Sequence, residues 1–241
     1  MTASEMLLAV AADAEQRVHD VGTGRYLFVE SRGWYLKTTV ADGVTSSKIA
    51  PVYRRQWKAA DGSGRILSVW GTPYAVPAPG EEIWRDPYED HWRDEDDRFE
   101  PGGLHLSWRP EDLSSKPEEL RNQLTAGQTD VTPIRVLTAV RDLYNEQPVV
   151  PSVAAAVLRI VADLPGLHSD QRYAGVRVSL DVDDESYSTR HVLMFDEDTG
   201  LLIGSEELLM RSAGYLEASV PCVVSRRIYI RAARTEFCGP A

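Results

Sequence analysis

Runs in which apolar and polar positions alternate fill the first and last parts of the chain, and apolar positions at helical spacing fill the middle. The clearest case is residues 190–210, where two runs, 191–195 and 201–203, flank the turn sequence DEDTG. Gly200 can adopt the positive φ of a short hairpin loop, and the aspartates can accept hydrogen bonds from their own backbone. The segment predicts a β-hairpin, and its residues indicate neither a reaction nor a ligand.

The first 70 residues predict one helix followed by four strands. An amphipathic helix is expected over 2–19, because the residues TASE at 2–5 fit a capping box. The strands are predicted at 25–31, 33–40, 48–58 and 64–70. The first two are expected to join at Arg32-Gly33 and the last two at the turn sequence DGSG. Pro51 marks an edge or a bulge in the third strand.

Residues 72–103 have a different character. They contain five prolines, and ten acidic residues stand against three arginines between 81 and 100. The segment is too long and too polar for a plain hairpin loop, so it is interpreted as a surface excursion, with residues 104–108 returning briefly to the sheet.

Three helices and five strands are expected in the remainder. Helices are predicted over 115–124, 134–144 and 153–163, the last nearly all apolar and therefore buried. Strands are predicted at 173–182, 188–195, 201–210, 215–220 and 222–234. Short loops join these strands, so they form an antiparallel meander. The order gives an α+β fold in a single domain, 1–241, with a large antiparallel sheet and helices packed on one face.

Composition and charge narrow the function classes. The formal net charge is −11, from 37 acidic and 26 basic residues. Nucleic acid is therefore not an expected partner, because its phosphates would be repelled on average. No run is apolar for the 18 residues of a membrane span, and Glu5 and Asp13 interrupt any signal-peptide pattern. Cys222 and Cys238 bracket one long predicted strand, so they are expected to be unpaired thiols.

Several motifs recur in an order that resembles a known family. They are Gly24-Arg25-Tyr26, Trp57 ahead of DGSGR at 61–65, residues 148–151 leading a helix to LPG at 164–166, and FDEDTGLL at 195–202. Together they resemble an uncharacterised bacterial family of membrane-anchored extracytoplasmic proteins, often encoded beside extracytoplasmic-function sigma factors. The strand and helix order also resembles the lipoprotein-carrier half-barrel.

The resemblance implies a curved half-barrel sheet that wraps helices and holds an acyl chain or a lipoprotein. It implies an extracytoplasmic location, with a membrane tether in the full-length protein if an upstream segment exists. A lipid, a lipoprotein or an envelope protein is the expected partner. The family has no established catalytic residues, so none is carried over, and a binding function is an analogy from fold.

Motifs for catalysis or metal binding are not found. None of the five histidines has a second ligand at zinc spacing, and the acidic runs at 94–97 and 181–185 lack the glycine of a calcium loop. No nucleophile elbow, dinucleotide loop or phosphate loop is present. No cofactor and no metal are therefore expected. His91, which stands among carboxylates, and His191 are the candidates for a hydrolase alternative.

All six tryptophans lie in the first half of the chain. Indoles on a sheet face line an apolar groove or a partner surface, or simply fill the core. The candidate ligand-binding residues are Trp34, Trp57, Trp70, Trp84 and Trp92. Trp84 and Trp92 fall in the acidic excursion, which is interpreted as a lid over the sheet or a partner-binding segment.

These observations favour a non-enzymatic extracytoplasmic binding or sensor module. A lipid-like ligand or a protein partner would lie between sheet and helices, with residues 72–103 as a gate. Two alternatives stay open: a hydrolase that uses His91 or His191 with carboxylates, and a regulatory scaffold domain without a small ligand.

Overall fold

The computed structural model describes residues 1–17, 20–81, 84–128, 131–170, 175–183, 187–211, 214 and 216–239. The four α-helices of this part are α1 (Ala3–Gln16), α2 (Pro117–Leu124), α3 (Pro133–Glu146) and α4 (Pro151–Ala162). A short 3-10 helix, η1, spans Pro110–Asp112. The strands are β1 (Tyr26–Ala41), β2 (Val44–Ala59), β3 (Gly64–Gly71), β4 (Tyr74–Ala75), β5 (His91–Phe99), β6 (His168–Asp170), β7 (Val176–Asp183), β8 (Ser188–Phe195), β9 (Leu202–Leu209) and β10 (Cys222–Thr235).

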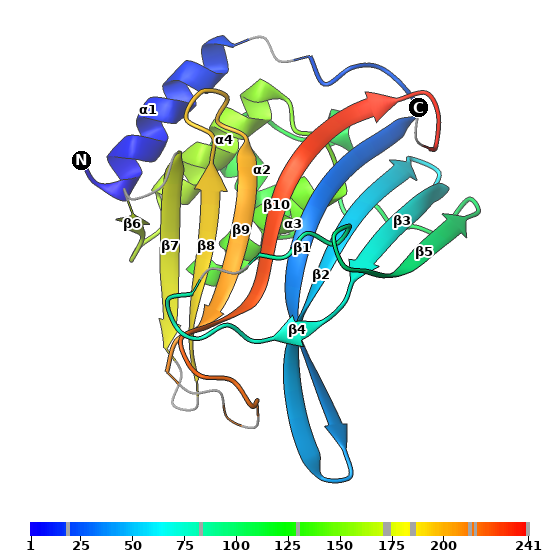
Figure 1. Cartoon of the computed structure of the whole chain (residues 1–241). Coiled ribbons are helices and arrows are strands. Elements are labelled where there is room, and N and C mark those ends of the chain that lie inside the picture. Colours follow the sequence, from blue (N-terminus) through cyan, green and yellow to red (C-terminus); the bar gives the residue numbers. More distant parts are fainter. Residues whose placement is uncertain are drawn as a thin grey trace.

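All ten described strands belong to one antiparallel sheet, with the order β5-β3-β2-β1-β10-β9-β8-β7-β6 and β4 beside β2. The N-terminal and C-terminal halves join in the middle, where β10 pairs with β1. The sheet is open and curved, and helices cover one of its faces (Figure 1). The predicted α+β half-barrel is confirmed, and four of the five strands predicted for the C-terminal meander, β7 to β10, form it.

The helix ends follow the sequence signals closely. Thr2 caps α1 through both bonds of a capping box, since its hydroxyl accepts from the Glu5 N–H and the Glu5 carboxylate accepts from the Thr2 N–H. The predicted extension of this helix over Val18 and His19 lies outside the described residues. Helix α4 is buried on almost every side and packs mainly against α1, as its apolar sequence predicts.

The predicted break at Arg32-Gly33 is wrong, because residues 26–41 form one strand. A Cβ on Gly33 would lie 2.6 Å from the Tyr35 ring, so this glycine makes room for a neighbouring side chain and does not form a turn. Pro51 is not on an edge strand either. It lies between the part of β2 that pairs with β4 and the part that pairs with β3. At this point the N–H that proline lacks is not needed for a ladder hydrogen bond, so its absence costs little stability.

Other strand predictions also need correction. Residues 104–108 and 216–220 form no strand, and β7 begins at Val176, directly after a bend at Gly175. Residues 173, 174 and 215 of the predicted strands lie outside the described residues. Strand β6 and the two strands inside the excursion, β4 and β5, were not predicted. The sequence of β5, HWRDEDDRF, is highly charged because the strand is exposed at the edge of the sheet.

The two faces of the sheet are distinguished by the strand register. Paired residues point to the same side, so Trp34 and Trp57 share one face, and Val52, Gln56 and Trp70 share the other. The Gln56 amide donates to a carbonyl at the end of α3, which places the helices on its side. We call this side the helix face and the opposite side the outer face.

The described residues of 74–85, which are 74–81, 84 and 85, cover part of the outer face. Trp34, Ile49 and Tyr74 form a small core there, with Trp84 packed against it. The indole N–H of Trp34 donates to the Arg85 carbonyl oxygen at 2.9 Å. The excursion therefore crosses the sheet on the side away from the helices (Figure 1). No helix in the described part of the chain is both long and apolar enough to span a membrane.

Candidate functional site: an apolar cavity where two strands separate

The candidate site lies where β9 and β10 separate. These neighbouring strands pair from the Cys222 end only as far as Ile228, which lies opposite Gly204. Beyond this point β10 continues beside β1 to Thr235, whereas β9 turns toward its hairpin with β8. The two strands therefore diverge at this end of the sheet (Figure 1), and Pro148 and Val149 of the α3–α4 connection line the opening between them.

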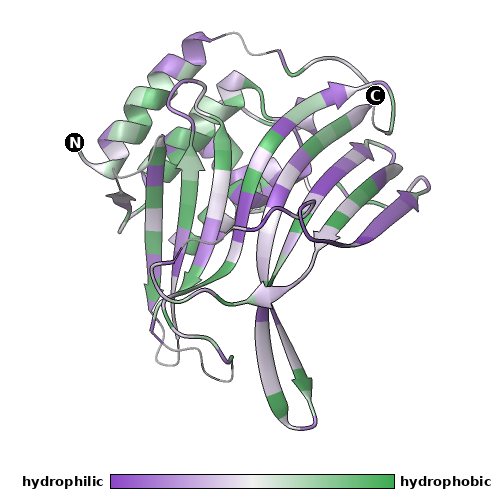
Figure 2. Cartoon of the chain, in the orientation of Figure 1, coloured by the Kyte–Doolittle hydropathy of each residue, from purple (hydrophilic) through white to green (hydrophobic). Residues whose placement is uncertain are grey.

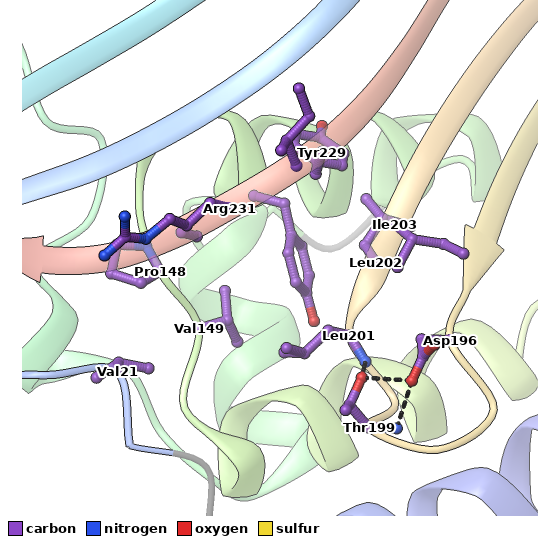
Figure 3. Close-up of a pocket in the computed structure, with 13 residues that line it drawn as sticks. Val21, Pro148, Val149, Asp196, Thr199, Leu201, Leu202, Ile203, Tyr229 and Arg231 are labelled. Atoms are coloured by element: carbon purple, nitrogen blue, oxygen red, sulfur yellow. Dashed lines mark hydrogen bonds between the residues drawn. The ribbon is translucent and has the colours of Figure 1, made fainter. Parts of the chain in front are cut away.

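A cavity of about 330 Å³ occupies this opening. Its walls are mainly apolar side chains from β9, β10, the β8–β9 turn, the α1–β1 connection and the α3–α4 connection, and Asp196, Thr199 and Arg231 also line it (Figure 3). The main apolar contributors are Val21, Val149, Leu201, Leu202, Ile203 and Ile230. This volume is at the lower end of the range for small-molecule sites, about 300–1,000 Å³.

The β8–β9 turn fixes one wall of the cavity. The Asp196 carboxylate accepts from the backbone N–H and the hydroxyl of Thr199, both at 2.7 Å, as the sequence of the turn predicts. Gly200 adopts a φ of +70° and packs against α1 and α4, since a Cβ there would lie 2.8 Å from that of Ala14 and 2.9 Å from Leu158 Cδ1. The turn is thereby held against the helices.

Two tyrosines and Asn145 fix the opposite wall. Tyr144 and Tyr229 both line the cavity, with ring centroids 6.4 Å apart. The Tyr229 hydroxyl donates to Asn145 Oδ1 at 2.6 Å, and the same amide oxygen accepts from Arg227. Burial raises the pKa of the phenols of both tyrosines. These residues tie the end of α3 to β10, so the wall exists before any ligand binds.

The polar groups at the cavity are few. Arg231 is exposed and lines the cavity, and no carboxylate in the described part of the chain pairs with it. Its guanidinium lies 5.8 Å from the centre of the Phe28 ring, on the outer face of the sheet. The other polar lining residues, Asp196 and Thr199, belong to the β8–β9 turn at the margin of the cavity. An apolar interior with polar groups at its margin is suited to holding a hydrocarbon group, with any polar end of the ligand outside.

The five predicted tryptophans do not converge on one groove. Trp34 and Trp84 pack edge to face at 5.5 Å on the outer face, where Trp57 stacks separately with Phe28 at 5.0 Å. Trp70 lies on the helix face with the Lys37 ammonium 4.0 Å from its ring, and its indole N–H donates to Glu95. Trp92 is 52% exposed beside Arg93 on edge strand β5.

None of these indoles, and no described residue of 72–103, lines the cavity between β9 and β10. The gating role expected for this segment therefore does not apply to this cavity, because the segment crosses the outer face. Whether the tryptophans bind a ligand stays a prediction. The sequence did not predict the cavity, because the only indication of it is the difference in length between two neighbouring strands. Strand β10 is longer than β9, and the end of β10 that β9 does not reach leaves space beside it.

The histidines of the hydrolase alternative lie on distant strands, His91 on β5 and His191 on β8. His91 Nε2 contacts Asp94 at 3.0 Å in the solvent. His191 Nε2 lies 3.1 Å from the Thr189 hydroxyl, and burial lowers its pKa, partly offset by Glu207. The space beside His191 is about 10 Å³, roughly the room that one water molecule needs.

The described residues form neither a metal-binding cluster nor a disulfide. No three His, Cys, Asp or Glu side chains in this part of the chain gather as metal ligands. Cys222 and Cys238 are unpaired, which confirms the expectation from their spacing. Burial raises the pKa of both thiols, so neither is an activated thiolate.

Fold and site together define an open α+β half-barrel with an apolar cavity between its sheet and its helices. No protein-family model and no curated protein matches the chain. A solved structure aligned with it is a LolA superfamily protein from Nitrosomonas europaea, at 9% identity over 98% of this chain and 95% of that chain, with a TM-score of 0.17. The pairing of the strands therefore defines the fold.

Proposed function

We propose that this chain is a non-enzymatic binding module that holds the hydrocarbon part of a lipid-like ligand between β9, β10 and the α3–α4 connection. The observation that carries the proposal is the cavity of about 330 Å³ with apolar walls and a preformed frame. Burying a methylene group contributes about 0.8 kcal/mol, so several methylenes suffice for measurable binding. A longer chain would leave through the open side of the cavity.

The cellular setting is part of the same proposal. The sequence resemblance supports an extracytoplasmic location, a membrane tether in the full-length protein and a connection with sigma-factor signalling. A lipid-binding module fits that setting because its ligand is available at the membrane surface. A lipoprotein, whose acyl chains offer the same hydrocarbon, is an equivalent partner for the cavity.

Uptake of a fluorescent fatty acid tests the proposal. We expect 11-(dansylamino)undecanoic acid to bind with one-to-one stoichiometry and a blue-shifted emission. Ala232 lines the cavity, and its neighbour Ala233 points to the outer face. A232F should therefore reduce binding at least tenfold, whereas A233F, the matched control on the same strand, should retain it.

Thermal unfolding of both variants shows whether they are folded. Absence of uptake by the wild-type chain, or equal uptake by folded A232F, would reject the lipid function. The first outcome would favour the regulatory scaffold, which requires no small ligand.

A further inference from the structure

The β1–β2 hairpin extends well beyond the sheet (Figure 1). Strand β1 pairs with β10 only as far as Tyr35, and the pairing of β2 with β4 ends at Lys48. Residues 38–47 pair only with each other. They form a two-stranded ribbon that contacts solvent on both faces and both edges, and we call them the ribbon.

The end of the ribbon is apolar on both of its faces. Val40 is 69% exposed and Val44 is 63% exposed. Val44 lies opposite Ala41 in the register and Val40 lies opposite Thr45, so the two valines point to opposite faces. Figure 2 shows the hydrophobic colour at this tip. A groove on a partner protein would bury one face, whereas a surrounding apolar medium would bury both.

The charge of the ribbon differs from that of the whole chain. Residues 36–48 contain two lysines and one aspartate, although the chain has a net charge of −11. Lys37 and Lys48 are exposed partners in the register, so they lie at the same distance from the tip. In the described part of the chain, neither forms a salt bridge with a carboxylate, and the Lys37 ammonium lies 4.0 Å from the centre of the Trp70 ring. The base of the ribbon is therefore a local cationic site.

We propose that the ribbon inserts its tip into an anionic lipid surface. The lysine pair is four residues from Ala41 and Val44, which at about 3.3 Å per residue is about 13 Å. Uncharged threonine and serine side chains fill the interval between tip and lysines. Apolar side chains at the acyl boundary, hydroxyl groups among the headgroups and lysines near the phosphates match the layers of a bilayer surface.

Asp42 opposes insertion, because its carboxylate sits at the turn of the ribbon. Its φ of +50° is tolerated by Asn as well as by Asp, so Asn can replace it without changing the turn. Removal of this charge should strengthen binding, which a purely structural role of the turn would not produce. The proposal does not depend on the cavity between β9 and β10 being occupied.

Vesicle co-sedimentation of the whole chain tests the proposal. We use vesicles of phosphatidylcholine alone and of phosphatidylcholine with a quarter phosphatidylglycerol. We expect weak binding to the anionic vesicles that falls with added salt, a fivefold or greater loss in the V40S/V44S double variant, and a gain in D42N. F237S is the matched control, because Phe237 is an apolar residue that is 82% exposed elsewhere.

Three outcomes would overturn the proposal. They are no binding to anionic vesicles, equal binding by wild type and V40S/V44S, and weaker binding by D42N. Light scattering tests the competing explanation, in which the edges of the ribbon pair between two copies of the chain. In that case the wild type would be a dimer and V40S/V44S would be a monomer. The A232F variant should bind vesicles normally, so failure of the cavity proposal and failure of this one are separable.

Discussion

Gln147, between α3 and α4, offers a quantitative test of the buried frame around the cavity. Its side chain is 0% exposed, and neither its amide nitrogen nor its amide oxygen has a hydrogen-bond partner in the described structure. Buried polar groups without partners are uncommon in folded proteins because they lose their bonds to water. Replacement by methionine keeps the length and removes both polar atoms.

The expected gain follows from those two atoms. An unpaired buried polar group costs about 1–3 kcal/mol, and replacing it with an apolar group of the same shape is neutral or stabilising. We expect Q147M to raise the free energy of unfolding by about 1–3 kcal/mol. For a chain of this size this corresponds to a rise in Tm of about 2–12 °C.

Urea unfolding followed by circular dichroism measures the change. The matched control is Q123M, because the Gln123 amide donates to the Asp112 carbonyl and accepts from the Ser114 N–H. This control should destabilise the protein by about 1–3 kcal/mol. If Q147M were destabilising by a similar amount, the amide would have a partner such as a buried water, and the reasoning would be refuted.

Three further predictions concern the sheet and its hairpin. Burial lowers the pKa of His191, so below about pH 6.5 the unfolded chain binds more protons than the folded chain. The free energy of unfolding should therefore fall as the pH drops below about 6.5. Urea titrations at several pH values should show a smaller fall in H191Q. Glu206 is buried and accepts hydrogen bonds from Arg177 and Arg226 at 2.6 Å each. E206Q should therefore lower the free energy of unfolding, measured in urea, by about 3 kcal/mol. An unchanged free energy of unfolding would contradict this prediction. G200A should lower the stability measured by thermal unfolding by at least about 1 kcal/mol. The added Cβ would clash with side chains of α1 and α4, and alanine disfavours the positive φ of this position. An unchanged Tm would count against this packing.

Much of the fold follows from local sequence signals. The capping box at Thr2, the turn at 196–200 and the apolar sequence of α4 each determine their own element, so these elements were predicted correctly. Errors arose where a residue serves a distant neighbour. Gly33 accommodates the Tyr35 ring, which local sequence cannot distinguish from a turn.

The candidate site could not be predicted in the same way. The cavity depends on where β9 leaves β10, and this is set by tertiary pairing over unequal strand lengths. The tryptophans were attractive candidates because of their size, yet alternation along the strands distributes them over both faces. Tyr144 and Tyr229 come together only when α3 and β10 meet in the folded chain.

The most direct test of the central claim is native mass spectrometry of the chain mixed with palmitic acid. We expect one bound fatty acid per wild-type chain, reduced occupancy in A232F and full occupancy in A233F. A wild-type chain that binds no fatty acid, or an occupancy that A232F leaves unchanged, would contradict the assignment of the β9–β10 cavity as a lipid-binding site.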